Sequence, residues 1–254
     1  MKTIVENPIL YDLLYADLSE DVEMYRKILK DSKSILEFGA GTGRVTIPLA
    51  LDNHFVEAVD LSKDMLKLLK QNIATSENLS KNVNPVLANM CNYNSKKKFD
   101  AIIVSLTSFN YLLTQKEQIE CLTSIKNNLK DNGFAIVELL SENTFLDTNE
   151  NDDYKFIKRL PINETDYYDY YRITKLDLKN RRISQYRKFN YYIKNNYISQ
   201  EIFAWNNRFV TIDDFKILTD IVGLSIEKIY GNCQLDEYSN ESEDVFVKLR
   251  RSKL

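Results

Sequence analysis

A glycine-rich turn between two apolar runs constrains this chain more than any other feature. Residues 35–62 read ILEFGAGTGRVTIPLALDNHFVEAVDLS, and Gly39, Gly41 and Gly43 come directly after a run that favours a buried strand. Glycine has no Cβ, so the backbone at Gly39 and Gly41 can approach a ligand closely. Three classes of ligand suit such a turn: a nucleotide phosphate, a dinucleotide pyrophosphate, or a molecule without phosphate.

Short apolar runs alternate with helical patterns between residues 34 and 140. Length and β-branched content favour strands over five of these runs. The five predicted strands are Ser34–Phe38, Phe55–Asp60, Pro85–Ala88, Asp100–Leu106 and Phe134–Leu140. Helical spacing of apolar residues predicts helices over Arg44–Leu51, Ser62–Ile73 and Gln115–Leu129. Strands and helices in alternation imply a parallel sheet that is covered on both faces.

Caps and turns mark the ends of several predicted elements. Ser62 suits the start of its helix, because its side chain can satisfy a free backbone N–H group. Lys130–Gly133 predicts a turn before the next strand. Thr211 is a suitable cap for a helix over Thr211–Val222. A closing strand pair, SIEKIYG and DVFVKLR, is expected around the acidic loop Asp236–Asp244.

The segment after residue 141 has a different pattern, which predicts antiparallel strands. Residues 166–196 are dense in tyrosine and contain stretches of alternating apolar residues. We expect three strands through Val210. The run LDLKNRRISQYR predicts a hairpin with its turn at Lys179 and Asn180, since asparagine tolerates turn conformations.

The few cysteine and histidine residues exclude several kinds of site. Cys91, Cys121 and Cys233 are far apart and form no CxxC pair, so we expect neither a structural zinc site nor a disulfide framework, and we assign no metal. His54 is the only histidine and lies in a predicted loop. A Ser-His-Asp or Cys-His nucleophile system is therefore not expected.

Length, charge and hydropathy bound the class of protein. A chain of 254 residues suits one large domain or a domain with an elaboration. Its net charge of -3 argues against a protein that coats nucleic acid along its whole surface. The N-terminus, MKTIVENPILYDLLY, is too polar for a signal peptide, and no run of about 18 apolar residues could span a membrane. We expect a protein of the reducing cytoplasm.

Two phosphate-binding motifs fail to match the glycine turn. A P-loop needs a lysine and a hydroxyl in GxxxxGK[ST], and neither is present there. The dinucleotide motif GxGxxG has its third glycine three positions after the second, where this chain has Arg44. The third glycine comes early, at Gly43, which gives E-x-G-x-G-x-G with Glu37 ahead of the first glycine.

Two carboxylates favour the third class of ligand. Glu37 ends the first predicted strand, where it would repel a pyrophosphate and suit a cationic ammonium group. Asp60 ends the next strand, where a carboxylate can accept hydrogen bonds from both hydroxyls of a ribose. A ligand with an ammonium group, a ribose and no phosphate is S-adenosylmethionine.

With these residues the chain resembles the class I S-adenosylmethionine-dependent methyltransferases. Within them it is similar to the small-molecule group that includes amino-sugar N-methyltransferases and glycine/sarcosine-type enzymes. The segments that carry the resemblance are YDLLY at 11–15, LEFGAGTGRVTIPLA at 36–50, VDLSKDML at 59–66 and FDAIIVSLTSFNYLL at 99–113. The resemblance implies an α/β fold, with a Rossmann-like seven-stranded sheet, helices on both faces and an antiparallel β insertion.

The resemblance also implies how the chain is organised and what it does. A single domain would span 1–254, with a helical cap at 1–33 and the cofactor-binding core at 34–140. The insertion, at about 151–210, would serve as a lid or a dimer element, and 211–254 would complete the core. The implied reaction transfers a methyl group from S-adenosylmethionine to an amine, less readily a hydroxyl, of a small molecule, and S-adenosylhomocysteine is the product.

The family pattern assigns a cofactor site by position. Its residues in this chain are Tyr11, Glu37, Gly39, Ala40, Gly41, Arg44, Asp60, Leu61, Met65, Asn89, Met90 and Ser105. Those at positions 37–41 would line the amino-acid half of the cofactor. Asp60 would hold the ribose hydroxyls, and Leu61 and Met65 would flank the adenine.

The remaining predicted cofactor residues would contact the adenine amine and the methionine half of the cofactor. Asn89, followed by Met90, stands where the family usually has an acidic residue that contacts the adenine amine, and an amide oxygen can still accept that hydrogen bond. Ser105 would supply backbone near the methionine moiety. Tyr11 and Arg44 would reach the cofactor carboxylate.

The acceptor is expected at the carboxyl ends of the strands, where ligands bind in such sheets. Tyr15, Tyr111 and Glu138 are the catalytic candidates there, because no histidine is available. The candidate substrate-binding residues are Tyr15 and Tyr111 together with Trp205 and Arg208, which lie where the insertion returns to the core. Aromatic rings beside a cation suit an amine or a flat substrate.

Other interpretations of the same residues stay open. Tyr11, Tyr15 and Met65 would also suit simple packing, and the tyrosines of the insertion could form a homodimer interface. Residues 154–196 interleave basic and tyrosine side chains, as surfaces that bind single-stranded RNA do. An RNA methyltransferase is therefore the alternative function, although charge alternation on an exposed hairpin explains the pattern too and the net negative charge argues against a nucleic-acid partner. A non-catalytic S-adenosylmethionine-binding protein is the third interpretation.

Overall fold

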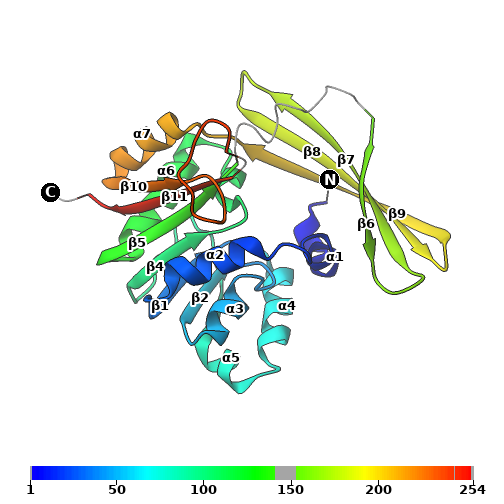
Figure 1. The fold of residues 1–254 in the computed structure, drawn as a ribbon, viewed down its shortest axis with the longest axis horizontal. Coiled ribbons are helices and arrows are strands. Elements are labelled where there is room, and N and C mark those ends of the chain that lie inside the picture. The colour runs from blue at the N-terminus through cyan, green and yellow to red at the C-terminus, as the bar shows by residue number, and fades with distance from the viewer. Residues whose placement is uncertain (1, 141–152, 243, 253–254) are drawn as a thin grey trace.

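Two β-sheets lie beside each other in the computed structural model, which describes residues 2–140, 153–242 and 244–252 (Figure 1). The short helix α1 (Pro8–Leu14) lies between them. The predicted insertion begins at residue 151, so its first two residues lie outside the described residues. The same is true of residue 243 in the predicted acidic loop.

The larger sheet, sheet A, forms the parallel core that the alternating pattern predicted. Its strands are β1 (Ser34–Phe38), β2 (Phe55–Asp60), β3 (Val83–Leu87), β4 (Phe99–Val104), β5 (Leu129–Leu139), β10 (Leu224–Tyr230) and β11 (Val245–Arg251). Their order across the sheet is β10-β11-β5-β4-β1-β2-β3. Strands β1 to β5 are parallel, whereas β11 is antiparallel to β5 and to β10. The predicted strands and the seven-stranded α/β fold are confirmed, with shifts at some strand ends.

Helices cover both faces of sheet A (Figure 1). Packed on one face are α2 (Glu20–Leu29), α3 (Thr46–Leu51), α4 (Lys63–Ile73) and α5 (Glu77–Asn82). Packed on the other are α6 (Gln115–Asn128) and α7 (Ile212–Val222). The predicted caps are confirmed: the Ser62 hydroxyl accepts from the Met65 N–H at 3.3 Å, and the Thr211 hydroxyl accepts from the Asp214 N–H at 3.1 Å.

The turn predicted at Lys130–Gly133 is wrong in its form, because these residues are part of β5. Leu129 pairs with Phe99 and Phe134 pairs with Ala101, so the four residues between them form a bulge against β4. Strand pairing on both sides of the bulge holds the segment in the sheet. The Lys130 ammonium also donates to the Asp100 carboxylate at 2.8 Å, which fixes the bulge to the neighbouring strand.

The smaller sheet, sheet B, is the antiparallel insertion. Its strands are β6 (Lys155–Pro161), β7 (Tyr167–Asp177), β8 (Arg182–Ile193) and β9 (Asn196–Arg208), in that order. The sequence predicted three strands through Val210, and the structure has a fourth, β6. Its sequence KFIKRLP lacks regular alternation because a bulge near Ile157 breaks the register, and only Leu160 is buried. The hairpin predicted at Lys179 and Asn180 is confirmed between β7 and β8.

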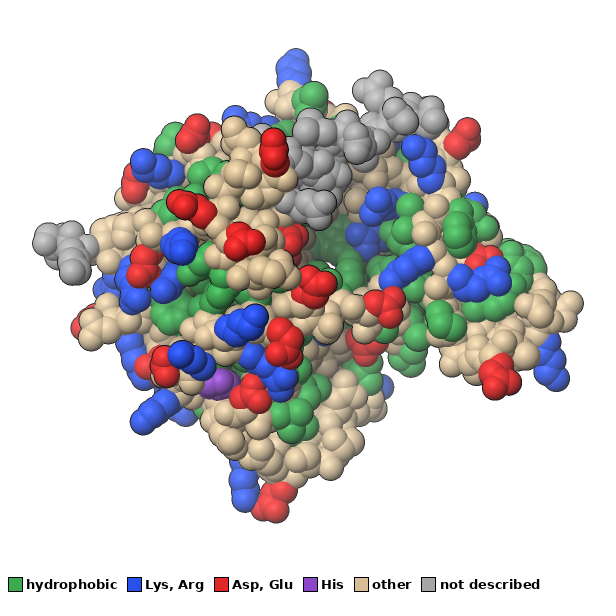
Figure 2. Space-filling view, viewed as in Figure 1, with side chains coloured by type: hydrophobic (Ala, Val, Ile, Leu, Met, Phe, Trp, Pro, Cys, Tyr) green, Lys and Arg blue, Asp and Glu red, His purple; other side chains and the backbone are tan. Residues whose placement is uncertain are grey.

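A third apolar core joins the N-terminal segment to sheet B. Ile4 of the 3-10 helix η1 (Ile4–Glu6) and Leu10 and Leu14 of α1 pack against Phe189 and Phe203 of the sheet. The Lys2 carbonyl accepts from the Ala204 N–H at 3.0 Å. Figure 2 shows a hollow between the two sheets with hydrophobic side chains at its base. Among the described residues, no helix is long and apolar enough to cross a membrane.

Candidate functional site

The glycine turn after β1 leaves open space beside Gly41. All three glycines have positive φ angles, of +75° at Gly39, +57° at Gly41 and +97° at Gly43, which other residues rarely adopt. A Cβ at Gly39 would collide with Ser108, and one at Gly43 would lie 2.5 Å from a methyl group of Leu69. Apart from Gly41 and its two neighbours in the chain, no residue has an atom within 4 Å of the Cβ position at Gly41. Gly41 is therefore the position of the turn that a ligand can approach most closely.

Asp60, at the end of β2, holds the glycine turn in place. One carboxylate oxygen accepts from the Gly41 N–H at 2.8 Å, and the other accepts from the Ser62 N–H at 2.7 Å. Burial raises the pKa of Asp60, and these backbone N–H groups oppose the rise. Each oxygen has a second lone pair, so the carboxylate can still accept from two hydroxyl groups of a ligand.

Glu37, at position 4 of the five-residue strand β1, lies behind the turn and is only 1% exposed. It accepts from the Thr46 hydroxyl at 2.5 Å and from the Ser105 hydroxyl at 3.2 Å. Burial raises the pKa of Glu37 to about 7, although both hydroxyl groups oppose the rise. The structure thus brings Glu37 and Ser105 together. A contact between Glu37 and a ligand ammonium stays a prediction.

Arg44 is held by an acidic residue that sequence reasoning missed. Its guanidinium donates two hydrogen bonds to the carboxylate of Asp21 in α2, at 2.7 Å and 2.5 Å, and a third to the Leu18 carbonyl at 3.1 Å. A cofactor carboxylate would compete with Asp21 for this guanidinium. The predicted role of Arg44 therefore stays a prediction.

The other predicted cofactor residues lie around the same edge of sheet A. Leu61 is 73% exposed, whereas Met65 is buried in α4 and Ala40 is buried in the turn. The Asn89 amide oxygen accepts from the Cys91 N–H at 2.9 Å, which fixes the loop after β3, and Met90 packs beside it. Their contacts with an adenine stay predictions.

Glu138 lies near the end of β5 and is half-buried. Its carboxylate accepts from the Leu106 N–H at 2.7 Å and from the Tyr25 hydroxyl at 3.4 Å. Burial raises the pKa of Glu138 to about 8, Asp21 adds to the rise, and the Leu106 N–H opposes it. Leu106 and Thr107 have φ angles of 47° and 54°, so the loop after β4 is strained beside this carboxyl group.

Three predicted acceptor residues come together on the inner face of sheet B, which faces α1. The ring centroids of Tyr111 and Trp205 lie 5.4 Å apart, and those of Tyr11 and Tyr15 lie 4.7 Å apart. Arg187 of β8 joins the two pairs: it donates to the Tyr15 hydroxyl at 3.0 Å and lies 3.5 Å from the centre of the Trp205 ring.

Sequence reasoning missed Arg187, although one signal could have found it. The residue stands in the alternation of Ile183, Gln185 and Phe189, which places its side chain on the buried face of β8. Charged side chains are almost never buried unless they have a partner or a function.

Arg208 does not join this group. It lies three positions after Trp205 on β9, so the two side chains point to opposite faces of sheet B. Its register partner is Arg182. Burial lowers the pKa of Arg208, and the nearby Arg182 and Arg181 lower it further. The predicted role of Arg208 in substrate binding stays a prediction.

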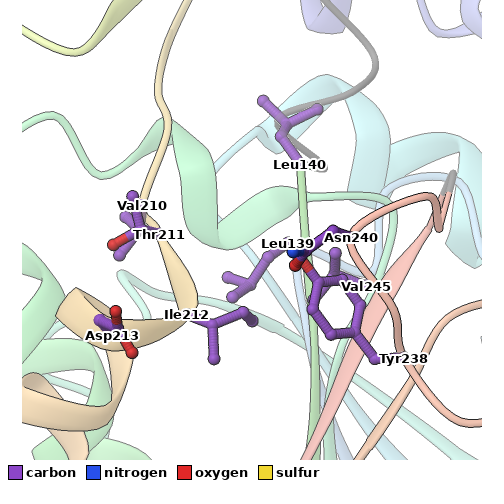
Figure 3. A pocket seen from close by; sticks show the side chains of 9 residues that line it. All are labelled: Leu139, Leu140, Val210, Thr211, Ile212, Asp213, Tyr238, Asn240 and Val245. Carbon is purple, nitrogen blue, oxygen red and sulfur yellow. The ribbon is translucent and has the colours of Figure 1, made fainter.

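Two cavities lie near the carboxyl ends of the strands. One, of about 410 Å³, lies where β5 ends and β11 begins, beside the start of α7, and none of the predicted site residues lines it (Figure 3). The other, of about 350 Å³, lies beside the glycine turn and is lined by Tyr15, Gly43 and Arg44 among others. The second cavity therefore adjoins the predicted cofactor site. His54 lies away from both, at the start of β2, with its Nδ1 atom 2.5 Å from the Ser32 carbonyl.

Comparisons with known proteins agree with this geometry. Residues 35–133 match the family model described as "Methyltransferase domain". The putative methyltransferase YqeM of Bacillus subtilis is 30% identical over 139 residues, which are 50% of this chain and 53% of that protein. The chain thus spans about half the length of the curated relatives it matches.

Solved structures show the likeness over almost the whole chain. An S-adenosylmethionine-dependent methyltransferase from Clostridium acetobutylicum has a TM-score of 0.80 at 19% identity and covers 96% of this chain and 97% of its own. An amino pentose methyltransferase from Micromonospora echinaspora, with S-adenosylmethionine bound, has a TM-score of 0.70 at 16% identity and covers 93% and 91%. At these identities the likeness shows the fold. Residues 35–133 thus match a methyltransferase domain, and the chain has the fold of the class I S-adenosylmethionine-dependent methyltransferases.

Proposed function

We propose that this protein transfers a methyl group from S-adenosylmethionine to an amine of a small molecule bound in the hollow between the two sheets. The observation that carries the proposal is the open space beside Gly41, where Asp60 joins the turn to the end of β2. A phosphate-free ribose ligand suits this place, because the Asp60 carboxylate can accept from ribose hydroxyls and the Glu37 carboxylate behind the turn disfavours a pyrophosphate.

The chain's own residues would align the acceptor and manage its proton. Bound S-adenosylmethionine would supply an electrophilic methyl group, whose bond to sulfur breaks as the bond to the acceptor forms. Tyr15 and Tyr111, with Trp205, would hold the acceptor and exclude water. Glu138 would take the proton that an ammonium acceptor must lose before its lone pair can attack. With a pKa of about 8, Glu138 can act as such a base in its deprotonated form.

The names of the relatives indicate different acceptor atoms, oxygen in some and nitrogen in others. Their names include a malonyl-[acyl-carrier protein] O-methyltransferase of Ilyobacter polytropus and a cypemycin N-terminal methyltransferase of Streptomyces. Structural neighbours include a sugar N-methyltransferase from Streptoalloteichus. We favour an amine because an ammonium group must lose a proton near neutral pH and Glu138 titrates in that range.

Transfer of a labelled methyl group tests this function. The purified protein would be incubated with labelled S-adenosylmethionine and, in separate reactions, with small-molecule extract and with total RNA. Label in small molecules, lost in Asp60→Ala, is the expected result. Label in RNA instead would indicate an RNA methyltransferase that binds its substrate through the basic, tyrosine-rich sheet B. Label in neither fraction, from a protein that binds the cofactor, would favour a non-catalytic role.

A homodimer through sheet B is a further part of the proposal. Its support is exposed apolar surface on β6 and β9, where Phe156 is 55% exposed, Tyr197 55% and Ile198 51%. Analytical ultracentrifugation of the wild type and of Phe156→Asp tests it. A dimer that the substitution dissociates is expected, and a wild-type monomer at tens of micromolar would contradict the dimer. A cytoplasmic location likewise stays a prediction.

A further inference from the structure

The inner face of sheet B holds a guanidinium group that no carboxylate neutralises within the described residues. Arg187 is only 8% exposed. Its hydrogen bonds go to neutral partners, the Gln185 amide oxygen at 2.7 Å and 3.2 Å and the Tyr15 hydroxyl at 3.0 Å. The Trp205 ring covers one face of the group. These bonds use three of the five N–H donors of a guanidinium, and two remain for a ligand.

A second arginine lies directly opposite. Arg172 of β7 is the register partner of Arg187, so the two side chains share the inner face of the sheet. Arg172 is half-buried; burial raises the pKa of the nearby Tyr170 phenol, and the charges of Arg187 and Arg172 oppose the rise. Like charges at directly opposed positions repel each other, and here both are partly removed from water. Such a pair is stable when a bound anion lies between its members.

The carboxylates on the elements that pack against this face are engaged elsewhere. Glu201 of β9 accepts from the Asn7 amide at 3.3 Å. Asp17 pairs with Lys158 at 3.4 Å. Asp12 of α1 accepts from the Thr42 hydroxyl at 2.5 Å. The aromatic groups nearest Arg187 are tyrosines and a tryptophan, which attract a cation but carry no full negative charge.

Tyr11 and Tyr15 connect the two arginines to the proposed cofactor site. The Tyr15 hydroxyl contacts Arg187, and its ring contacts that of Tyr11. Asp12 of the same helix accepts from the hydroxyl of Thr42 in the glycine turn at 2.5 Å, and Tyr15 lines one cavity with Gly43 and Arg44, so this end of α1 lies close to the glycine turn. Only the rings of Tyr11 and Tyr15 therefore separate a molecule bound at Arg187 from that turn.

We propose that the acceptor molecule carries an anionic oxygen group, a phosphate or a carboxylate, which binds between Arg187 and Arg172. Arg187 determines specificity through its two remaining N–H donors, and Arg172 adds charge. This inference rests on the proposed function for the methylation step alone, since the anion site exists in the protein without cofactor.

The fluorescence of Trp205 can test the site directly, because it is the only tryptophan in the chain and stacks on Arg187. Inorganic phosphate, pyrophosphate and acetate would each be titrated into the full-length protein at constant ionic strength, with chloride as the reference anion. Calorimetry on the same samples detects binding that leaves the fluorescence unchanged. We expect saturable binding of at least one of these anions, and the stronger ligand identifies the group as phosphate or carboxylate.

Variants of the two arginines locate the binding. Arg187→Gln should weaken it about ten-fold or more, as expected for loss of a charge-assisted contact, while Arg187→Lys should retain part of it. Arg172→Gln should weaken it less, and it covers the case in which Arg187→Gln fails to fold. Arg182→Gln, on the outer face of the same strand, is the matched control and should bind like the wild type.

Two results would overturn the inference: no saturable binding of any of these anions to the folded wild type, or equal binding to the wild type, Arg187→Gln and Arg172→Gln. Calorimetry with S-adenosylmethionine separates this outcome from failure of the proposed function. Anion binding without cofactor binding would support the anion site and contradict the proposed methyltransferase function. Cofactor binding without anion binding would contradict the anion site and leave the proposed function standing.

Discussion

At the scale of single residues, two carboxyl groups at the carboxyl ends of sheet A keep their protons near neutral pH. Burial raises the pKa of Glu37 to about 7 and that of Glu138 to about 8. The two have different surroundings: Glu37 is enclosed by two hydroxyl groups, whereas Glu138 is half-buried beside a strained loop. Carboxyl groups with raised pKa values cluster at functional sites, which agrees with an acceptor or cofactor bound beside them.

These two groups predict how stability depends on pH. An unfolded glutamate has a pKa of about 4.3, so between that value and about pH 8 the folded state holds protons that the unfolded state has released. The free energy of unfolding should therefore fall as pH rises from about 4.3 to about 8, and this contribution should be lost above the folded pKa values of about 7 and 8. Urea denaturation of the wild type and of Glu138→Gln at about pH 5, 7 and 9 measures it. A smaller fall in the variant is expected, and identical pH profiles would contradict the raised pKa of Glu138.

Asp60 predicts the strength of cofactor binding. Asp60→Ala should weaken S-adenosylmethionine binding at least several-fold, since a charge-assisted hydrogen bond contributes roughly 1.5–3 kcal/mol. Asp60→Asn, which keeps one acceptor oxygen, should have an affinity for S-adenosylmethionine between those of Asp60→Ala and the wild type. Calorimetric titration gives the affinities, and circular dichroism verifies the fold. Equal affinity in folded Asp60→Ala would remove Asp60 from the cofactor site.

At the scale of elements, local signals predicted helices and buried strands well but failed where pairing decides the structure. The caps at Ser62 and Thr211 were readable because they depend on neighbours in sequence. Lys130–Gly133 belong to a strand because the residues on either side of them pair with β4, which is far away in sequence. Their turn-forming residue types alone therefore gave a wrong prediction. Strand β6 lacked a pattern because it is an exposed edge strand with a bulge.

The site divides in the same way. Glu37, Gly41 and Asp60 could be predicted because they stand at fixed places after two strands, and the structure brings them to one edge. Arg187 could not be assigned a role, since its partner Tyr15 is 172 positions away in the sequence. Trp205 and Arg208 were grouped by closeness in sequence, and strand geometry then separated them.

The N-terminal cap of α6 gives a prediction about one element. The Thr114 hydroxyl accepts from the Glu117 N–H at 3.2 Å, and the Glu117 carboxylate accepts from the Thr114 N–H at 2.8 Å. Thr114→Ala should lower the free energy of unfolding by about 1 kcal/mol, as loss of such caps does. Thr123→Ala, later in the same helix, is the control and should change it less. Urea denaturation measures both changes, and a free energy of unfolding that is the same in Thr114→Ala as in the wild type would contradict the role of the cap.

At the scale of the whole molecule, α1 connects the core around sheet A to sheet B. Leu10 and Leu14 are buried in the third apolar core, and Tyr15, directly after the helix, bonds to Arg187 across it. Asp12 of the same helix accepts from the hydroxyl of Thr42 in the glycine turn at 2.5 Å. The position of α1 therefore sets the distance between the proposed cofactor and acceptor sites.

Two neighbouring residues of α1 test this connection. Leu10 is 1% exposed and Ile9 is 69% exposed. Leu10→Ala should cost about 2–5 kcal/mol of stability, because it leaves a cavity in the third core, and it should also weaken S-adenosylmethionine binding by displacing Tyr11. Ile9→Ala is the matched control and should change neither quantity appreciably. Equal effects of the two substitutions on denaturation and calorimetry would contradict the proposed packing.

Calorimetric titration of the wild-type protein with S-adenosylmethionine, S-adenosylhomocysteine and NAD in parallel tests the central claim most directly. The glycine turn with Glu37 and Asp60 predicts saturable binding of the two sulfur ligands and none of NAD, because Glu37 disfavours a pyrophosphate and the glycine spacing departs from GxGxxG. Binding of NAD, or no binding of either sulfur ligand to the folded protein, would contradict the account.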